Sequence, residues 1–160
     1  MSNLRIDAYE KGWMLASGIL LLVFLLAVGA SVFYGFRLPG HEARIEPGRV
    51  AADPPFAEPR VMESGPGRYD AYMRVQIWAF VPSEIKVPAG SSVTFYLTSP
   101  DVLHGLMIER TNVNVMVLPG QVSKISARFD EPGEYRFLCH EYCGIGHHLM
   151  FGKVVVTPRS

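Results

Sequence analysis

The chain has 160 residues, with 15 Lys and Arg balanced by 15 Asp and Glu, so its formal net charge at pH 7 is zero. A chain without excess positive charge lacks the basic surface that binds nucleic acid, so no nucleic-acid partner is expected. The length allows one domain of ordinary size, about 100–120 residues, with a smaller segment beside it.

An uncharged, strongly apolar run covers residues 12–36, between Lys11 and Arg37. As a helix this run would measure about 37 Å, more than the hydrocarbon core of a bilayer, which is about 30 Å thick. Trp13 and Tyr34, near its two ends, suit the membrane interface. A cleaved signal peptide is the alternative, but its apolar core is usually about 7–15 residues long. We therefore predict a membrane-anchoring helix within residues 1–37, whose orientation the flanking charges do not decide.

The next segment, residues 38–67, contains six prolines and four glycines, which disfavour helices and central strands, so a linker is predicted. From residue 68 to residue 160 apolar and polar side chains alternate, most clearly in three runs at 73–79, 92–97 and 123–129. Turn sequences separate these runs, and two final strands are expected at 134–138 and 152–157. Short strands at this spacing are typical of an all-β sandwich or barrel.

The loop between the last two predicted strands holds the only two cysteines of the chain, Cys139 and Cys143, followed by His147 and Met150. Thiolates, imidazoles and thioethers are soft or borderline ligands, which favour copper over magnesium or calcium. A disulfide is one alternative, but residues four positions apart would close a very small loop and stabilise little. A zinc site is another, although zinc seldom takes a methionine ligand.

A site for a single blue copper ion needs one Cys, two His and a weak axial Met, so this loop has one cysteine more than required. Two thiolates can instead bridge two copper ions, each of which then needs one imidazole and one weaker ligand. His147 supplies one imidazole, and His104 is the best candidate for the other because a β-sandwich brings the loops at one end together. Three apolar residues are expected to keep the site dry and tune its reduction potential: Leu103, Leu149 and Phe151.

The motif Cys139-x-Glu141-x-Cys143-Gly144-x-x-His147-x-x-Met150, with Asp101-Val102-Leu103-His104 upstream, strongly resembles the binuclear copper (CuA) domain of cytochrome c oxidase subunit II. The single N-terminal span and the sequence Ala8-Tyr9-Glu10-Lys11-Gly12-Trp13 are similar to the B-type haem–copper oxidases. The resemblance implies a cupredoxin-like Greek-key sandwich holding two copper ions.

The resemblance also implies a role for each ligand. Cys139 and Cys143 would bridge the two copper ions. His104 and Met150 would complete the coordination of one, while His147 and the backbone carbonyl of Glu141 would complete that of the other.

By the same resemblance, the chain would be a subunit of a terminal oxidase. It would accept electrons from a cytochrome c type donor and pass them to haem in subunit I, where oxygen reduction is coupled to proton pumping. The copper domain would lie on the periplasmic side of the inner membrane, and this chain would hold no oxygen-reducing site. The alternatives are a membrane-tethered copper carrier or assembly protein, and the CuA domain of another reductase.

Three further residues have two interpretations each. Trp78 is either a core residue or, as in the family, an exposed aromatic near the docking surface of the donor. Glu10 is either an interfacial carboxylate or a residue near the entrance of the proton-uptake path. The carboxylate of Glu141 is either solvated or, as in more distant oxidases, a magnesium ligand at the boundary with subunit I.

Overall fold

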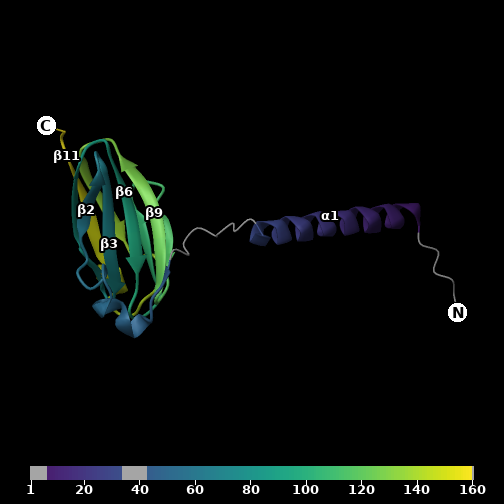
Figure 1. Cartoon of the computed structure of the whole chain (residues 1–160), viewed down its shortest axis with the longest axis horizontal. Helices are drawn as coiled ribbons and strands as arrows, with labels where there is room; N and C mark the ends of the chain where they lie inside the picture. The colour runs from purple at the N-terminus through teal and green to yellow at the C-terminus, as the bar shows by residue number, and fades with distance from the viewer. Residues whose placement is uncertain (1–6, 34–42, 160) are drawn as a thin grey trace. The chain divides into compact units, whose positions relative to one another are not determined.

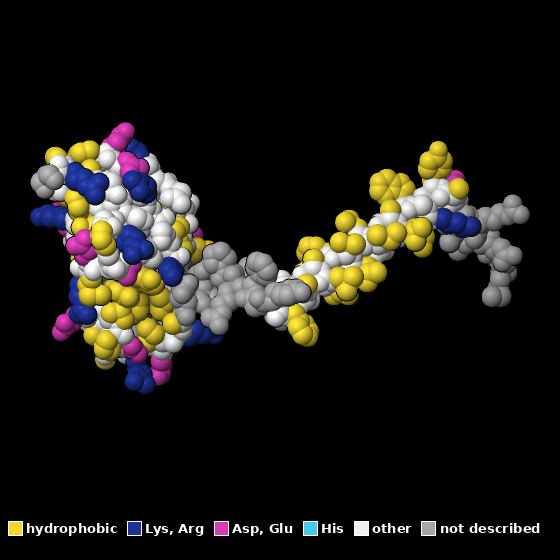
Figure 2. Space-filling model, turned by 45° about the horizontal axis from the view of Figure 1, so that its top comes forward, with side chains coloured by type: hydrophobic (Ala, Val, Ile, Leu, Met, Phe, Trp, Pro, Cys, Tyr) yellow, Lys and Arg dark blue, Asp and Glu magenta, His cyan; other side chains and the backbone are white. Residues whose placement is uncertain are grey.

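The computed structural model describes residues 7–33 and 43–159, as a helix and a β-sheet unit that are considered separately (Figure 1). Helix α1 spans Ala8–Phe33. Its segment Ala8–Ser31 is long and apolar enough to cross a membrane, and Figure 2 shows apolar side chains along its length. The helix therefore lies within the predicted anchor, whose residues 1–6 and 34–37, including Tyr34, fall outside the described residues.

The β-sheet unit consists of two sheets with a shared apolar core. The first sheet has the strand order β1-β9-β6-β3-β2, with β4 paired to β3, and the second has the order β5-β11-β10-β7-β8. The strands are β1 (Ala43–Arg44), β2 (Val61–Gly65), β3 (Arg68–Gln76), β4 (Ala79–Val81), β5 (Glu84–Pro88), β6 (Ser91–Thr98), β7 (His104–Ile108), β8 (Asn114–Val117), β9 (Gln121–Phe129), β10 (Gly133–Leu138) and β11 (Phe151–Thr157). Two short 3-10 helices, η1 (Pro47–Ala52) and η2 (His147–Leu149), lie between strands.

Large side chains from both sheets fill the space between them. Phe95 of β6, Phe129 of β9 and Phe137 of β10 are completely buried. Phe95 packs edge-on against Phe129, and Phe137 packs edge-on against Phe80 of β4. Burying a side chain of this size stabilises the fold by about 1.5–3 kcal/mol, so the loops at the ends of the strands are carried on a rigid scaffold.

The predicted all-β sandwich is confirmed. The three alternating runs correspond to β3, β6 and β9, and the two final predicted strands correspond to β10 and β11. The first strand ends earlier than the predicted run, which reached residue 79. β3 ends at Gln76, and the chain turns at residues 77–78 before β4 begins. His104 was expected in a loop but is the first residue of β7, a strand in which four of five residues are buried and alternation is therefore weak.

Part of the predicted linker packs on the β-sheet unit. From residue 43 the chain forms β1, η1 and β2, and Val50 and Phe56 are buried in a second apolar cluster with Val122. Tyr72 and Tyr96, stacked with ring centroids 4.8 Å apart, pack against this cluster. The prolines are compatible with this packing because η1 begins at Pro47, where a missing N–H costs little. Residues 38–42 fall outside the described residues, and the domain limits themselves stay a prediction.

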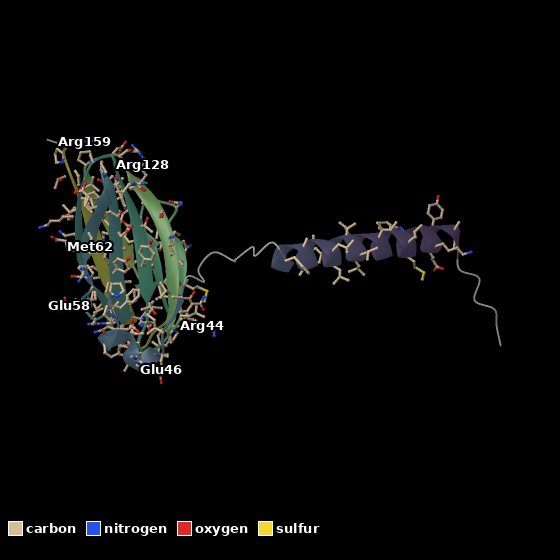
Figure 3. The ribbon with its side chains drawn as sticks, in the orientation of Figure 1. Arg44, Glu46, Glu58, Met62, Arg128 and Arg159 are labelled. Carbon is tan, nitrogen blue, oxygen red and sulfur yellow. The ribbon has the colours of Figure 1, made fainter. Side chains whose placement is uncertain are left out.

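The predicted functional residues of the β-sheet unit gather at one of its two ends. Figure 3 labels Arg128 and Arg159 at the end where the C-terminus lies and Glu46, beside η1, at the opposite end. The β10–β11 loop, the turn at residues 77–78 and the start of β7 belong to the end near η1, because the strand registers align them there. The functional residues predicted from the sequence of the β-sheet unit all come from these segments.

Candidate metal centre

The β10–β11 loop is closed at its base by the β-ladder. Leu138 pairs with Phe151 as the last pair of the two strands, and the Cys139 N–H donates to the Met150 carbonyl at 3.1 Å. Within the loop, Gly144 has a φ of 113°, in the region that favours glycine. The short helix η2 then turns the chain back, with the Met150 N–H donating to the His147 carbonyl. These contacts direct the side chains of Cys139, Cys143 and Met150 inward.

The two cysteines lie side by side as thiols rather than as a disulfide. Their sulfur atoms are 3.9 Å apart, almost twice the length of an S–S bond, about 2.05 Å. Both residues are buried and unbridged. The disulfide alternative therefore does not describe this structure, and the gap between the sulfurs leaves room for metal.

Each sulfur has two further atoms beside it that can ligate a metal. The Sγ atom of Cys139 is 3.2 Å from the Glu141 carbonyl oxygen and 3.9 Å from Nδ1 of His104. The Sγ atom of Cys143 is 3.5 Å from Nδ1 of His147 and 3.7 Å from Sδ of Met150. All six predicted metal-site residues are thus brought together, although they come from two separate segments of the chain.

His104 is completely buried and its orientation is fixed by Asp101. Its Nε2 atom lies 2.8 Å from Oδ1 of Asp101. Because a carboxylate oxygen accepts, Nε2 carries the proton, which leaves Nδ1 as the free donor on the side of Cys139. A carboxylate on the second nitrogen of a ligating histidine is a common way to fix its tautomer and raise its basicity.

Asp101 is itself held in place by backbone groups. Its Oδ2 accepts the Ile77 N–H at 2.7 Å, and its Oδ1 accepts the Val102 N–H at 2.6 Å and the Ser99 hydroxyl at 3.0 Å. Sequence reasoning missed this role, although Asp101 belongs to the segment that carried the family resemblance. An acidic residue three positions before a candidate ligand was the available signal.

The two thiols differ in acidity. Burial raises the pKa of Cys139, but the hydrogen bonds with His104 and with the Gly105 N–H favour its thiolate more strongly, and its pKa falls to about 6. Burial and the neighbouring Cys139 charge both raise the pKa of Cys143, to about 11. One thiolate is therefore available near neutral pH, and the second forms only when a cation replaces its proton.

His104 and Asp101 favour their charged forms. Burial alone would lower the pKa of His104, but its hydrogen bonds to Cys139 and Asp101 raise it above the ordinary value. Burial alone would raise the pKa of Asp101, but the Ile77 N–H and the His104 ring lower it. In the metal-free site, the Cys139 thiolate, the His104 imidazolium and the Asp101 carboxylate thus stabilise one another.

The donor set fits copper. The ligand atoms of His104, Cys139 and Cys143 all lie within 4.8 Å of one another and are buried. A buried thioether beside them, from Met150, is a ligand that copper accepts and that structural zinc sites seldom use. The residues present therefore match a copper site better than the zinc alternative.

Trp78 is not a core residue, and its place near a donor stays a prediction. It lies in the turn between β3 and β4, is 45% exposed, and donates from Nε1 to the Cys143 carbonyl oxygen at 3.1 Å. A side chain at Gly146 would overlap the indole ring, so the loop lies flat against one face of the tryptophan. The residue both packs on the metal loop and reaches the surface.

The apolar surround was predicted wrongly in part. Leu149 is 65% exposed and Phe151 is 54% exposed, because η2 and the first residue of β11 face outward. Cys139, Cys143 and Met150 instead belong to the buried core cluster that also contains Leu106 of β7 and Val117 of β8.

The two remaining predicted residues, Glu10 and the carboxylate of Glu141, each lie close to one neighbouring residue. Glu10 lies in the first turn of α1 and accepts a hydrogen bond from the Asp7 N–H at 3.2 Å. The carboxylate of Glu141 lies 3.5 Å from Nδ1 of His140 and is partly exposed. The proton-path role of Glu10 and the magnesium role of Glu141 stay predictions.

The two-sheet arrangement, with sulfur and nitrogen donors at one end, defines a cupredoxin-like metal-binding domain. The same fold occurs in the crystal structure of the periplasmic domain of subunit II of cytochrome oxidase from Bradyrhizobium japonicum. The TM-score is 0.52 at 16% identity, over 56% of this chain and 83% of that chain.

The family model "Cytochrome C oxidase subunit II, periplasmic domain" matches residues 69–157. The chain is 42% identical over 154 residues to cytochrome c oxidase subunit 2 of Thermus thermophilus, covering 93% of this chain and 92% of the relative. A cryo-EM structure of a heme-copper terminal oxidase dimer contains a chain with 36% identity and a TM-score of 0.63, over 94% of this chain and 99% of that chain. The chain therefore belongs to the cytochrome c oxidase subunit II family, and it is the subunit of a haem–copper oxidase that receives electrons.

Proposed function

We propose that the β10–β11 loop and His104 hold two copper ions bridged by Cys139 and Cys143. The observation that carries this proposal is the pair of thiols 3.9 Å apart with four further donors beside them. His104 and Met150 would complete the coordination of one metal, and His147 and the Glu141 carbonyl would complete that of the other. Because every donor is already in place, the ligands need only small displacements to bind.

When bound, the copper pair supplies a one-electron carrier in which two metals share the change of charge. The chain contributes rigidity and a fixed proton on His104. Asp101 keeps that proton on Nε2, and the β-ladder holds Cys139 and Met150 at the base of the loop. A site whose ligands hardly move has a small reorganisation cost for each electron.

The surface beside the loop suits a protein donor of the cytochrome c type. Three large apolar side chains of the loop are strongly exposed, Tyr142, Ile145 and Leu149, and such a group of exposed residues commonly marks a protein contact. Trp78 lies next to them and is connected to Cys143 by one hydrogen bond. We assign Trp78 as the point where electrons reach the centre, with haem in subunit I as their destination.

The apolar helix α1 anchors the chain in the lipid of the inner membrane, with the copper domain on the periplasmic side. The family description, a periplasmic domain, supports this orientation. The first turn of α1 then faces the cytoplasm, where Glu10 lies near the entrance of the proton-uptake path of the proton-pumping oxidase. Glu10→Gln is expected to slow proton uptake by the assembled oxidase while leaving the copper spectrum unchanged.

The test of the copper assignment is metal analysis and EPR spectroscopy of the full chain purified in detergent. Two copper ions per chain are expected, with hyperfine splitting from one unpaired electron shared by two copper nuclei. A single labile Cu(I), silent in EPR, would contradict the proposal and would support a copper carrier instead.

A further inference from the structure

His140 lies opposite Gly105 in an extension of the β7–β10 pairing. The observed register pairs Phe137 with Ile108 and Leu138 with Met107. Two more steps of the same antiparallel register place Cys139 across from Leu106 and His140 across from Gly105. Gly105 is in turn paired with Met116 of β8, so His140, Gly105 and Met116 form one row across the sheet.

This row lies on the outer face of the sheet. Side chains alternate between faces along a strand, and Leu106 and Ile108 of β7 and Phe137 of β10 belong to the core. Gly105 and His140 therefore face away from the core, on the reverse side of the strands that supply His104 and Cys139.

The His140 ring packs directly on Gly105. A Cβ atom built on Gly105 would come within 3.0 Å of three ring atoms of His140, namely Cε1, Nε2 and Cδ2. The φ angle of Gly105 is not in the positive region, so its backbone conformation does not require glycine. The absence of a side chain at residue 105 instead provides the space that the imidazole occupies.

The covered backbone includes a hydrogen bond to a metal ligand. The Gly105 N–H donates to Sγ of Cys139 at 3.5 Å. Such bonds, and the access of water to the sulfur, are among the factors by which a protein sets the reduction potential of a copper–thiolate site.

The ring is placed there by packing rather than by a hydrogen bond of its own. Its Nε2 atom is buried and has no hydrogen-bond partner among the described residues, while Nδ1 is turned toward Glu141 at 3.5 Å. A buried unpaired nitrogen carries a free-energy cost, so the position is one that the surrounding chain imposes.

We infer that His140 is a positioning residue that covers Gly105, keeps water from the Gly105–Cys139 N–H···S bond and thereby raises the reduction potential of the copper centre. This inference rests on the proposed copper pair. Without the ring, water reaches the sulfur and stabilises the oxidised centre, which carries one more positive charge than the reduced centre. Weakening of the N–H···S bond shifts the potential in the same direction.

The test uses the full chain in detergent, with a potentiometric titration of the copper absorption and hydrogen exchange of the Gly105 amide. In His140→Ala the copper pair is expected to remain. The ratio of reduced to oxidised centre at a fixed ambient potential is expected to fall about threefold to tenfold, and the Gly105 amide is expected to exchange faster. A tenfold change corresponds to about 59 mV for one electron. His140→Phe restores a ring without nitrogens and is expected to return both values toward the wild type.

A double substitution separates this contact from general damage. Gly105→Ala should displace the ring and lower the potential as His140→Ala does, but should have little further effect when added to His140→Ala. The control is His148→Ala, which removes an exposed imidazole of the same loop and should leave potential and exchange unchanged.

Wild-type potential and wild-type Gly105 exchange in His140→Ala would overturn the inference. Failure of His140→Phe to restore the potential would also overturn it, because the nitrogens and not the cover would then matter. If a variant binds no copper, Gly105 exchange in the metal-free chain still decides the question. Absence of a copper pair in the unsubstituted chain would contradict the proposed function instead.

Discussion

The metal centre has two halves that the fold supports differently. The sheet half consists of His104, the first residue of β7, and Cys139, which directly follows β10. Both are buried, Asp101 holds His104, and the Gly105 N–H donates to Cys139. The loop half consists of Cys143 and His147, in a loop that exposes Tyr142 and Ile145 and receives a hydrogen bond from the indole of Trp78. The comparison indicates a division of work, in which the sheet half fixes the geometry and the loop half faces the partner that delivers electrons.

The largest expected effect comes from removing the bridge that joins the halves. Cys143→Ser should abolish the copper pair, because each metal loses one of its two shared thiolates. Copper content and EPR of the full chain measure this, and Met62→Leu, which alters an exposed thioether outside the site (labelled in Figure 3), is the control. A retained two-copper signal in Cys143→Ser would show that the bridging assignment is wrong.

A second prediction concerns the acidity of the two thiols without metal. Ultraviolet absorption of the metal-free chain should show one thiolate forming at a pKa of about 6 and the other at about 11. Because the charge on Cys139 raises the pKa of Cys143, Cys139→Ser should lower it toward the ordinary value. Two thiols that titrate together near 9 would remove the proposed difference between the halves.

A third prediction concerns Asp101, whose carboxylate contacts His104, and tests the sheet half alone. Asp101→Asn keeps the shape but removes the charge that fixes the ring, and copper affinity should fall by about 10-fold to 100-fold. Competition with a Cu(I) chelator measures the affinity. The matched control is Asp130→Asn, which breaks an exposed pair with Arg128 outside the site, and an equal loss in both variants would contradict the assigned role.

The smallest predicted effect concerns the loop half. Trp78→Phe keeps an aromatic ring but loses the hydrogen bond to the Cys143 carbonyl, so the free energy of unfolding should fall by about 1 kcal/mol. Electron transfer from a cytochrome c donor should slow while the reduction potential is unchanged. Denaturation and stopped-flow measurements test this, with Trp13→Phe, at the only other tryptophan, as control. A wild-type rate in Trp78→Phe would exclude the indole from the electron path.

Much of this arrangement could be predicted from the sequence, because the features are local. Alternation revealed β3, β6 and β9, and the spacing of Cys139, Cys143, His147 and Met150 indicated the loop half almost completely. Counting imidazoles predicted that His104 lies with these residues, as it does, although its place at the start of a buried strand was not expected.

The missed features depend on which strands become neighbours. Gly105 contacts Cys139, which lies 34 residues away, and Asp101 accepts from the Ile77 N–H, 24 residues away. Nothing in the immediate sequence reveals these neighbours, although the contact of Asp101 with His104 is local. Burial of Val50 and Phe56 against the first sheet is hidden in the same way, because the prolines and glycines of residues 38–67 predict a linker. Exposure of Leu149 and Phe151 depends on how η2 turns the chain.

The closed base of the β10–β11 loop has a consequence for how such sites can change. The Leu138–Phe151 strand pair and the backbone hydrogen bond from Cys139 to Met150 bring the two ends of the loop together. The residues between these ends can therefore be replaced together while the strands stay in register. A metal site built in this way can gain or lose a cysteine without refolding its domain. The ligands within the loop are therefore the easily altered part of this architecture, whereas His104 and the strands beneath the loop form its fixed part.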